Sequence, residues 1–113
     1  MTERHQDRGL PQLIDGLSSI ADRYGFFVVD QWGCLHDGIQ AHPGAREVLE
    51  ELQRHQRPVA LVSNSSRSTA PSQAILDDLG FPGELYAAML TAGQLAERFL
   101  VDAIRQGTVS KVL

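Results

Sequence analysis

Two short polar stretches of this sequence carry the side chains best suited to chemistry. Asp30 directly follows the apolar run 26–29, and Ser63 and Asn64 directly follow the apolar run 58–62. A carboxylate at the tip of a buried strand is costly to place unless a metal, a charge or a reaction uses it. A carboxylate beside hydroxyl, amide and loop N–H groups suits a phosphate and a divalent cation. These residue types therefore predict a site for a phosphoryl group.

The spacing of apolar residues predicts the elements that would bring these stretches together. Strands over 26–29 and 58–62 alternate with helices over 10–24, from about 44, over 71–79 and over 92–106, and 81–90 is irregular or holds a short strand. The second helix is expected to bury Ala45, Val48, Leu49 and Leu52. Such alternation is typical of a parallel sheet with crossover helices. Successive parallel strands are usually neighbours, so Asp30 should lie within reach of Ser63 and Asn64.

The composition narrows the class of protein. The chain has 113 residues, enough for one domain, and a formal net charge of -4 with no basic run, so no nucleic-acid partner is expected. No apolar stretch approaches the roughly 18 to 20 residues of a membrane span, and no membrane partner is expected. The polar segment 1–8 lacks the apolar core of a signal peptide. With Cys34 as the single cysteine, no internal disulfide can form, and a cytoplasmic location is expected.

The polar stretches and their surroundings resemble a known family. Segments 30–35 (DQWGCL), 43–45 (PGA) and 61–68 (LVSNSSRS), together with Gly38, are similar to motifs I and II of the haloacid dehalogenase (HAD) superfamily. The resemblance is to class IIA, the nitrophenylphosphatase and sugar-phosphatase-like branch, and it covers about residues 10–99. It implies an α/β fold, part of a Rossmann-like core. Residues 1–90 would be the N-terminal half of that core, and 91–113 the linker helix and beginning of a cap domain, with a strand starting near 109.

The resemblance also implies a chemistry for individual residues. Asp30 matches the family's nucleophile, which forms an aspartyl-phosphate in a Mg2+-dependent transfer from a small phosphorylated metabolite. Ser63 matches the hydroxyl that binds the transferring phosphoryl group, and Asn64 and Ser65 would help to hold it. Mg2+ would be ligated by Asp30 and by the backbone carbonyl of Trp32.

One departure from the family concerns proton transfer. Trp32 stands where the family usually has a second Asp as general acid and base, and an indole cannot fill that role. Positioned acid–base catalysis contributes about 100- to 10,000-fold, so alkyl phosphates should react slowly and aryl or acyl phosphates should lose less. Trp32 either packs over the site or anchors its loop. His36 is a candidate substitute acid, oriented by Asp37; the alternative is a surface histidine in a flap.

A second departure concerns the groups that should complete the site. The family's motif III lysine and motif IV acidic pair have no match here, and Lys111 lies in the expected first cap strand instead. The isolated chain is therefore expected to have little or no activity. Two alternatives stay open: a non-catalytic phosphate-binding module, and a half-domain that completes its sheet with another copy, as a homo-oligomer, or with another protein.

Overall fold

The centre of the fold is a small parallel sheet. The computed structural model describes residues 9–108 and 110, and it contains three strands, β1 (Phe27–Asp30), β2 (Val59–Ser63) and β3 (Ala88–Thr91). Their spatial order is β1-β2-β3, and both pairs are parallel. The predicted α/β class and the predicted neighbourhood of the first two strands are confirmed. The short strand considered for residues 81–90 exists as β3, which follows the 3-10 turn η4 (Gly83–Leu85).

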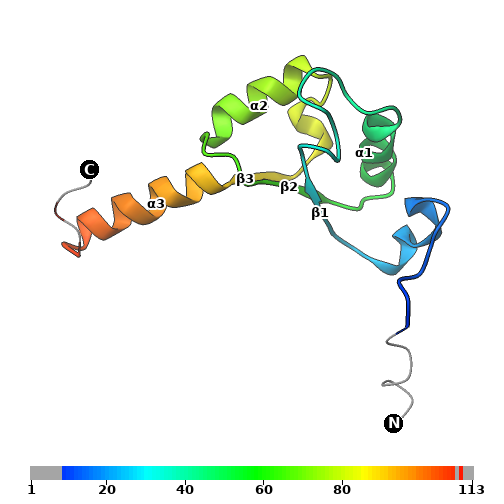
Figure 1. Ribbon diagram of the computed structural model, residues 1–113, viewed down its shortest axis with the longest axis horizontal. Helices are drawn as coiled ribbons and strands as arrows, with labels where there is room; N and C mark the ends of the chain where they lie inside the picture. Colours follow the sequence, from blue (N-terminus) through cyan, green and yellow to red (C-terminus); the bar gives the residue numbers. More distant parts are fainter. Residues whose placement is uncertain (1–8, 109, 111–113) are drawn as a thin grey trace, which may run out of the picture.

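Two crossover helices cover one face of this sheet. Helix α1 (Ala45–Arg54) connects β1 to β2, and α2 (Thr69–Asp78) connects β2 to β3. Figure 1 shows both helices on the same side of the strands, while α3 (Ala92–Arg105) runs on from β3 away from them. Both crossover connections therefore lie on one side of the sheet, and the opposite face carries no crossover helix among the described residues.

The hydrophobic core lies between the covered face and the two crossover helices. Side chains alternate along the strands, so Val59 and Leu61 of β2 point toward the helices and are 2% and 0% exposed. Leu49 of α1 and Leu76 of α2 belong to the same core cluster as these two residues. Phe81, which follows α2, is buried in it as well. The expected burial of Leu49 and Leu52 on α1 is confirmed, whereas Val48 is exposed because it lies on the side of α1 that turns away from the sheet.

The other face of the sheet and most of α3 are open to solvent. Val28 and Leu90, whose strand positions alternate with the buried ones, are 62% and 40% exposed. Most apolar side chains of α3 are exposed as well, and the buried residue of this helix is Ala103. Leu95 and Phe99 are exposed because α3 runs away from the two crossover helices.

The N-terminal segment differs most from the prediction. In place of one helix over 10–24 the chain forms two single-turn 3-10 helices, η2 (Leu17–Ser19) and η3 (Ala21–Arg23). The residues ahead of them are extended, and Leu10 and Leu13 are each 95% exposed. Among the described residues these leucines have no surface to pack against, so helical spacing alone does not produce a helix here.

Several boundaries also move by a few residues. Strand β1 begins one residue later than predicted and includes Asp30, and α2 begins at Thr69, two residues before Pro71. Left-handed glycines follow α2 and α3: Gly80 and Gly107 have φ of 92° and 73°. The strand expected at 109–113 falls outside the described residues, apart from position 110. Within the described part of the chain, no helix has the length and apolarity needed to cross a membrane.

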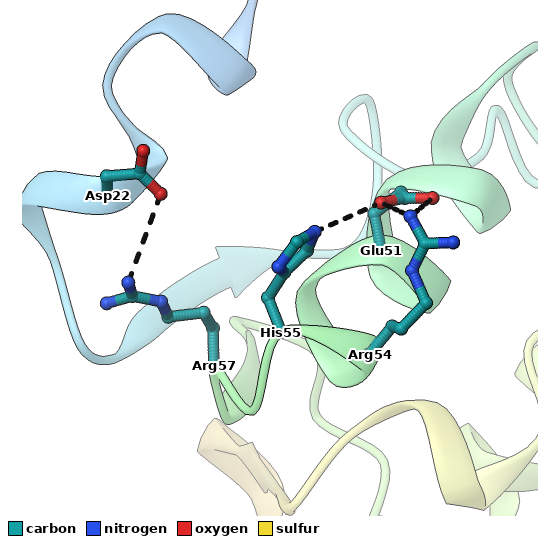
Figure 2. A network of polar contacts seen from close by, with 5 residues as sticks. All are labelled: Asp22, Glu51, Arg54, His55 and Arg57. Carbon is teal, nitrogen blue, oxygen red and sulfur yellow. Dashed lines mark hydrogen bonds and ion pairs between the residues drawn. The ribbon is translucent and has the colours of Figure 1, made fainter.

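A surface network holds the N-terminal segment near the amino edge of the sheet. Figure 2 shows its five polar side chains: Asp22, Glu51, Arg54, His55 and Arg57. Arg57 precedes β2, donates to the Tyr24 carbonyl at 2.6 Å and lies 4.0 Å from the Asp22 carboxylate. Glu51 on α1 meets Arg54 and His55. Exposed pairs of this kind contribute little stability, and they leave the carboxyl edge of the sheet free.

Candidate functional site

The carboxyl edge of the sheet contains an open pocket of about 500 Å3. Asp30 at the end of β1 lines it together with Ser63 at the end of β2 and Asn64 just beyond. In the strand register Asp30 lies beside Val62, and Ser63 lies beside Thr91. The three polar residues that the sequence places at strand ends thus contribute to one pocket, and the apolar part of its wall includes Val62, Leu90 and Leu95.

Asp30 offers a carboxylate that is open to solvent. Its position alternates with the half-buried residues Phe27 and Val29 of β1, so the side chain lies on the uncovered side of the sheet. One oxygen, Oδ1, accepts a hydrogen bond from the Gln31 N–H at 2.8 Å. The pocket that this carboxylate lines also includes Ser63, Asn64 and an apolar wall, residue types suited to a phosphate ester.

The donor set fits half of a magnesium site. Among the described residues, no three His, Cys, Asp or Glu side chains gather closely enough to hold a metal ion. Asp30 and the Trp32 carbonyl would be the oxygen ligands in this chain, and Mg2+ commonly binds through one or two carboxylates with substrate phosphate and water. The backbone hydrogen bonds of this loop use the carbonyls of Gln31 and His36, not that of Trp32. The available oxygens thus match the cation in kind.

The turn after β2 is shaped by its own serines. The Ser63 hydroxyl oxygen accepts the Ser65 N–H at 3.1 Å, and the Ser65 hydroxyl oxygen accepts the Arg67 N–H at 3.2 Å. These local bonds fold the chain back at the strand end, as serine side chains commonly do in turns. Ser63 lines the open pocket, whereas Ser65 and Arg67 line a second, much smaller cavity behind it. The structure therefore separates Ser65 from the pocket that Asp30, Ser63 and Asn64 share.

Two residues that the sequence analysis did not assign to the site support this turn. The Gly93 N–H donates to the Ser65 carbonyl at 3.0 Å, and a Cβ at Gly93 would lie 2.1 Å from the Ser66 carbonyl oxygen. A glycine in the first turn of a helix is the signal that could have indicated this close approach. Thr91, fully buried, lines the pocket and caps α3.

Thr91 and Gln94 form only one half of a capping box at the start of α3. The Thr91 hydroxyl oxygen accepts the Gln94 N–H at 3.1 Å. The Gln94 side chain does not return to Thr91, because its Oε1 accepts the Thr69 N–H at 3.2 Å. The glutamine therefore joins the start of α3 to the start of α2, which fixes both helices against the turn between them.

Trp32 packs against its own loop. Its ring lies 5.1 Å from the His36 ring, centroid to centroid, in an edge-to-face arrangement. A Cβ at Gly38 would come within 2.3 Å of the indole, and Gly38 has φ of 92°, so this position needs glycine on both counts. These contacts support the interpretation that Trp32 anchors its loop, and not the alternative that it packs over the site.

His36 is buried, with 1% of its surface exposed. Burial lowers the pKa of its imidazole, the nearby Asp37 acts in the opposite direction and His42 adds to the lowering. The expectation that Asp37 orients this ring is wrong: the Gly38 N–H donates to Nδ1 at 3.0 Å. Asp37 instead accepts from the N–H groups of Gln40 and Ile39, which lower the pKa of its carboxyl.

Comparison with known proteins places this arrangement in a family. The family model described as haloacid dehalogenase-like hydrolase matches residues 27–112. The chain belongs to the haloacid dehalogenase-like hydrolases. Among curated proteins, it is 34% identical to chronophin from Bos taurus over 99 residues, which are 82% of this chain and 33% of that protein. It is 38% identical to chronophin from Homo sapiens over 73 residues, which are 60% of this chain and 25% of that protein.

A solved structure supports the same assignment. The crystal structure of a haloacid dehalogenase-like hydrolase from Brucella suis 1330 aligns with a TM-score of 0.72 and 27% identity, over 79% of this chain and 34% of that one. The resemblance to class IIA drawn from the two motifs is thus confirmed. The chain spans about a quarter to a third of the length of these relatives. The part of it that matches the family model, residues 27–112, includes all three strands.

Proposed function

We propose that this chain carries the nucleophilic part of the active site of a Mg2+-dependent phosphatase for a small phosphorylated metabolite. The observation that carries the proposal is the single pocket shared by Asp30, Ser63 and Asn64 at the carboxyl edge of a sheet from a hydrolase family. Open α/β sheets bind their ligands at this edge. A lone carboxylate beside hydroxyl and amide groups suits attack on a phosphoryl group better than binding of a cation alone.

In the proposed reaction, the Ser63 hydroxyl and the Asn64 amide bind the phosphoryl oxygens. The Asp30 oxygen that does not accept the Gln31 N–H attacks phosphorus, and the ester P–O bond breaks with its electrons leaving on the alcohol oxygen. Mg2+, held by Asp30 and the Trp32 carbonyl, would neutralise charge on the phosphoryl group. The product of this step is an aspartyl-phosphate and a free alkoxide or phenolate.

The Trp32 side chain sets which substrates react well. An alkoxide leaving group needs a proton as it departs, and an indole does not supply one. A nitrophenolate leaves without protonation, so aryl phosphates should phosphorylate Asp30 much faster than alkyl phosphates. Hydrolysis of the aspartyl-phosphate also lacks a base to activate water. The turnover of this chain should therefore be very low, as expected, and the reaction should stop at the covalent intermediate, which a trapping experiment detects.

The test is a trapping experiment. The chain is incubated with p-nitrophenyl phosphate and Mg2+, reduced with borohydride and analysed by mass spectrometry for a modified Asp30. Asp30→Asn should decrease the adduct by at least about 1,000-fold, because no carboxylate remains to attack. Asp22→Asn is the matched control, since Asp22 is exposed and lies near the amino edge of the sheet. Equal rates with alkyl and aryl phosphates would contradict the assignment made to Trp32.

A second candidate function is phosphate binding without catalysis. It is favoured by the tryptophan at position 32 and by the absence of a metal-binding acidic cluster among residues 9–108 and 110. Phosphate binding followed by 31P NMR distinguishes the two functions. Binding that depends on Ser63 but yields no adduct at Asp30 would replace the phosphatase proposal with this one.

Two further assignments accompany the proposed function. Residues 91–113 form the linker helix and the beginning of a cap domain; the exposure of α3 supports this division from the core at 1–90. The protein acts in the cytoplasm, which agrees with the single, exposed cysteine at position 34.

A further inference from the structure

A small, partly open cavity lies between the loop after β1 and the turn after β2. Gln31 and His36 line it from the loop, Ser63 and Ser65 line it from the turn, and Ser72 lines it from α2. About 10 Å3 is open to the centre of a water-sized sphere. This space is large enough for one water molecule.

Two buried donors of this cavity have no protein partner. His36 Nδ1 accepts the Gly38 N–H at 3.0 Å, so the neutral ring carries its proton on Nε2. That nitrogen and the Gln31 side-chain nitrogen are both buried without a hydrogen-bond partner in the chain. The two residues are 1% and 3% exposed. Buried N–H groups without a partner are costly. Two such donors beside a water-sized space indicate a place where an acceptor binds.

The opposite wall supplies acceptors. The hydroxyl oxygens of Ser63 and Ser65 each accept one backbone N–H, and a hydroxyl oxygen has a second lone pair. Ser72 directs its own hydroxyl proton to the Ser68 carbonyl at 3.2 Å, which leaves its oxygen available as an acceptor. A water molecule that accepts twice and donates twice would match two donors on one wall and two serine oxygens on the other.

We propose that one resident water molecule fills this cavity and links His36 Nε2 and the Gln31 amide to the serine hydroxyls, Ser63 among them. Ser63 lines both the cavity and the open pocket, so the water ties the Asp30 loop to the residue expected to bind phosphate. His36 is then a positioning residue: it acts through the water on Ser63 and donates no proton to a leaving group. Only this last consequence rests on the proposed function.

The charged groups around His36 agree with a neutral donor at this place. Asp37 directs one carboxylate oxygen to the Ile39 and Gln40 N–H groups, so its charge is engaged within the turn. Arg67 lines the cavity from the turn. The Trp32 ring covers the imidazole from the side. Because Nδ1 accepts the Gly38 N–H, Nε2 is the ring nitrogen that remains as the donor.

The test is a high-resolution crystal structure of the chain together with NMR of 15N-labelled histidine. We expect an isolated density peak within hydrogen-bond distance of both side-chain nitrogens. We also expect an Nε2-protonated tautomer for His36 and a cross-relaxation signal between its ring N–H proton and bound water. A dry cavity, an Nδ1-protonated ring or a direct bond from Nε2 to a protein oxygen would overturn the proposal.

Variants separate the water-linked role from simple packing. His36→Gln keeps a side-chain N–H donor and should retain the peak, whereas His36→Met fills similar space without a donor and should lose it. The backbone amide signals of Ser65 and Arg67 should move in the methionine variant and return toward wild type in the glutamine variant. His55→Gln, on the exposed end of α1, is the matched control and should leave these signals unchanged.

The same variants distinguish a failure of this inference from a failure of the proposed function. His36→Gln should retain adduct formation at Asp30 within about twofold and the same pH profile, since the water link survives. Loss of the adduct with a changed pH profile in this variant would show that His36 is the acid and would overturn the positioning role. Absence of an adduct in wild type, with the water in place, would reject only the phosphatase.

Discussion

The two faces of the sheet differ in almost every property that matters for folding and for chemistry. The covered face presents Val59 and Leu61, which are nearly or fully buried against α1 and α2. The open face presents Val28 and Leu90, which are 62% and 40% exposed, and it ends at Asp30. Both faces come from the same three strands, and their side chains alternate residue by residue.

This contrast shows that stability and reactivity come from opposite sides of one element. Leu61 at the centre of β2 contributes packing, whereas Asp30 at the tip of β1 contributes a solvated carboxylate. The pocket can use a charge because it lies outside the packed core, where a carboxylate need not be desolvated completely. The turn after β2, held by Ser63 and Gly93, connects the two regions.

The largest expected change in the free energy of unfolding comes from shortening a side chain on the covered face of the sheet. Leu61→Ala should lower the free energy of unfolding by about 2 to 5 kcal/mol, because it leaves a cavity between the sheet and two helices. Val28→Ala, the matched change on the open face, should cost less than about 1 kcal/mol. Urea denaturation measures both. Similar costs at the two positions would mean that another surface covers the open face in solution.

A smaller effect is expected where α3 meets the serine turn. Gly93→Ala should destabilise the chain by about 1 to 3 kcal/mol, because the new methyl group would collide with the Ser66 carbonyl. Gly25→Ala is the control: no heavy atom lies within 4 Å of a Cβ there, and its effect should stay within about 0.5 kcal/mol. The measurement is again denaturation by urea. If Gly93→Ala stabilised the chain, the gain in helix propensity would exceed the cost of the clash, and the turn would be able to shift away from the new methyl group.

The smallest expected effect is a dependence of the unfolding free energy on pH, caused by His36 in the loop after β1. Burial lowers the pKa of His36 in the folded chain from its usual 6.5, so the unfolded chain binds more protons between these two values. The neutral ring's contribution to stability is therefore complete above about pH 6.5 and decreases as the pH falls through the lowered pKa. The difference in unfolding free energy between wild type and His36→Gln, measured from pH 8 to pH 5, should follow this course. A difference that is constant with pH would contradict the burial of a neutral imidazole.

The sequence indicated the sheet and its reactive edge because their signals are local. The apolar runs before Asp30 and Ser63 are short and continuous, which is typical of strands buried in parallel sheets, and their polar ends lie at the carboxyl edge. The segment before β1 gave a false signal. Leu10 and Leu13 follow helical spacing, but a helix that short needs a surface to pack against, and no such surface lies beside them.

The arrangement around His36 could not be predicted from spacing. Asp37 is its neighbour in sequence and was the natural partner for the imidazole, yet the Gly38 N–H takes that place. The left-handed backbone at Gly38 turns the chain so that its N–H meets the ring while Trp32 covers it. Such a contact depends on backbone direction within a tight loop, and residue types alone do not specify it.

The sequence by itself determined that this chain forms alternating strands and helices and that a carboxylate and a serine turn follow two successive strands, because side-chain polarity and spacing act over a few residues. Only the tertiary structure decided which face of the sheet is covered, which serines share a pocket with Asp30, and that His36 is buried beside a small cavity. Those outcomes depend on how crossover helices and loops fill space around the sheet, and packing couples residues that are distant in the chain.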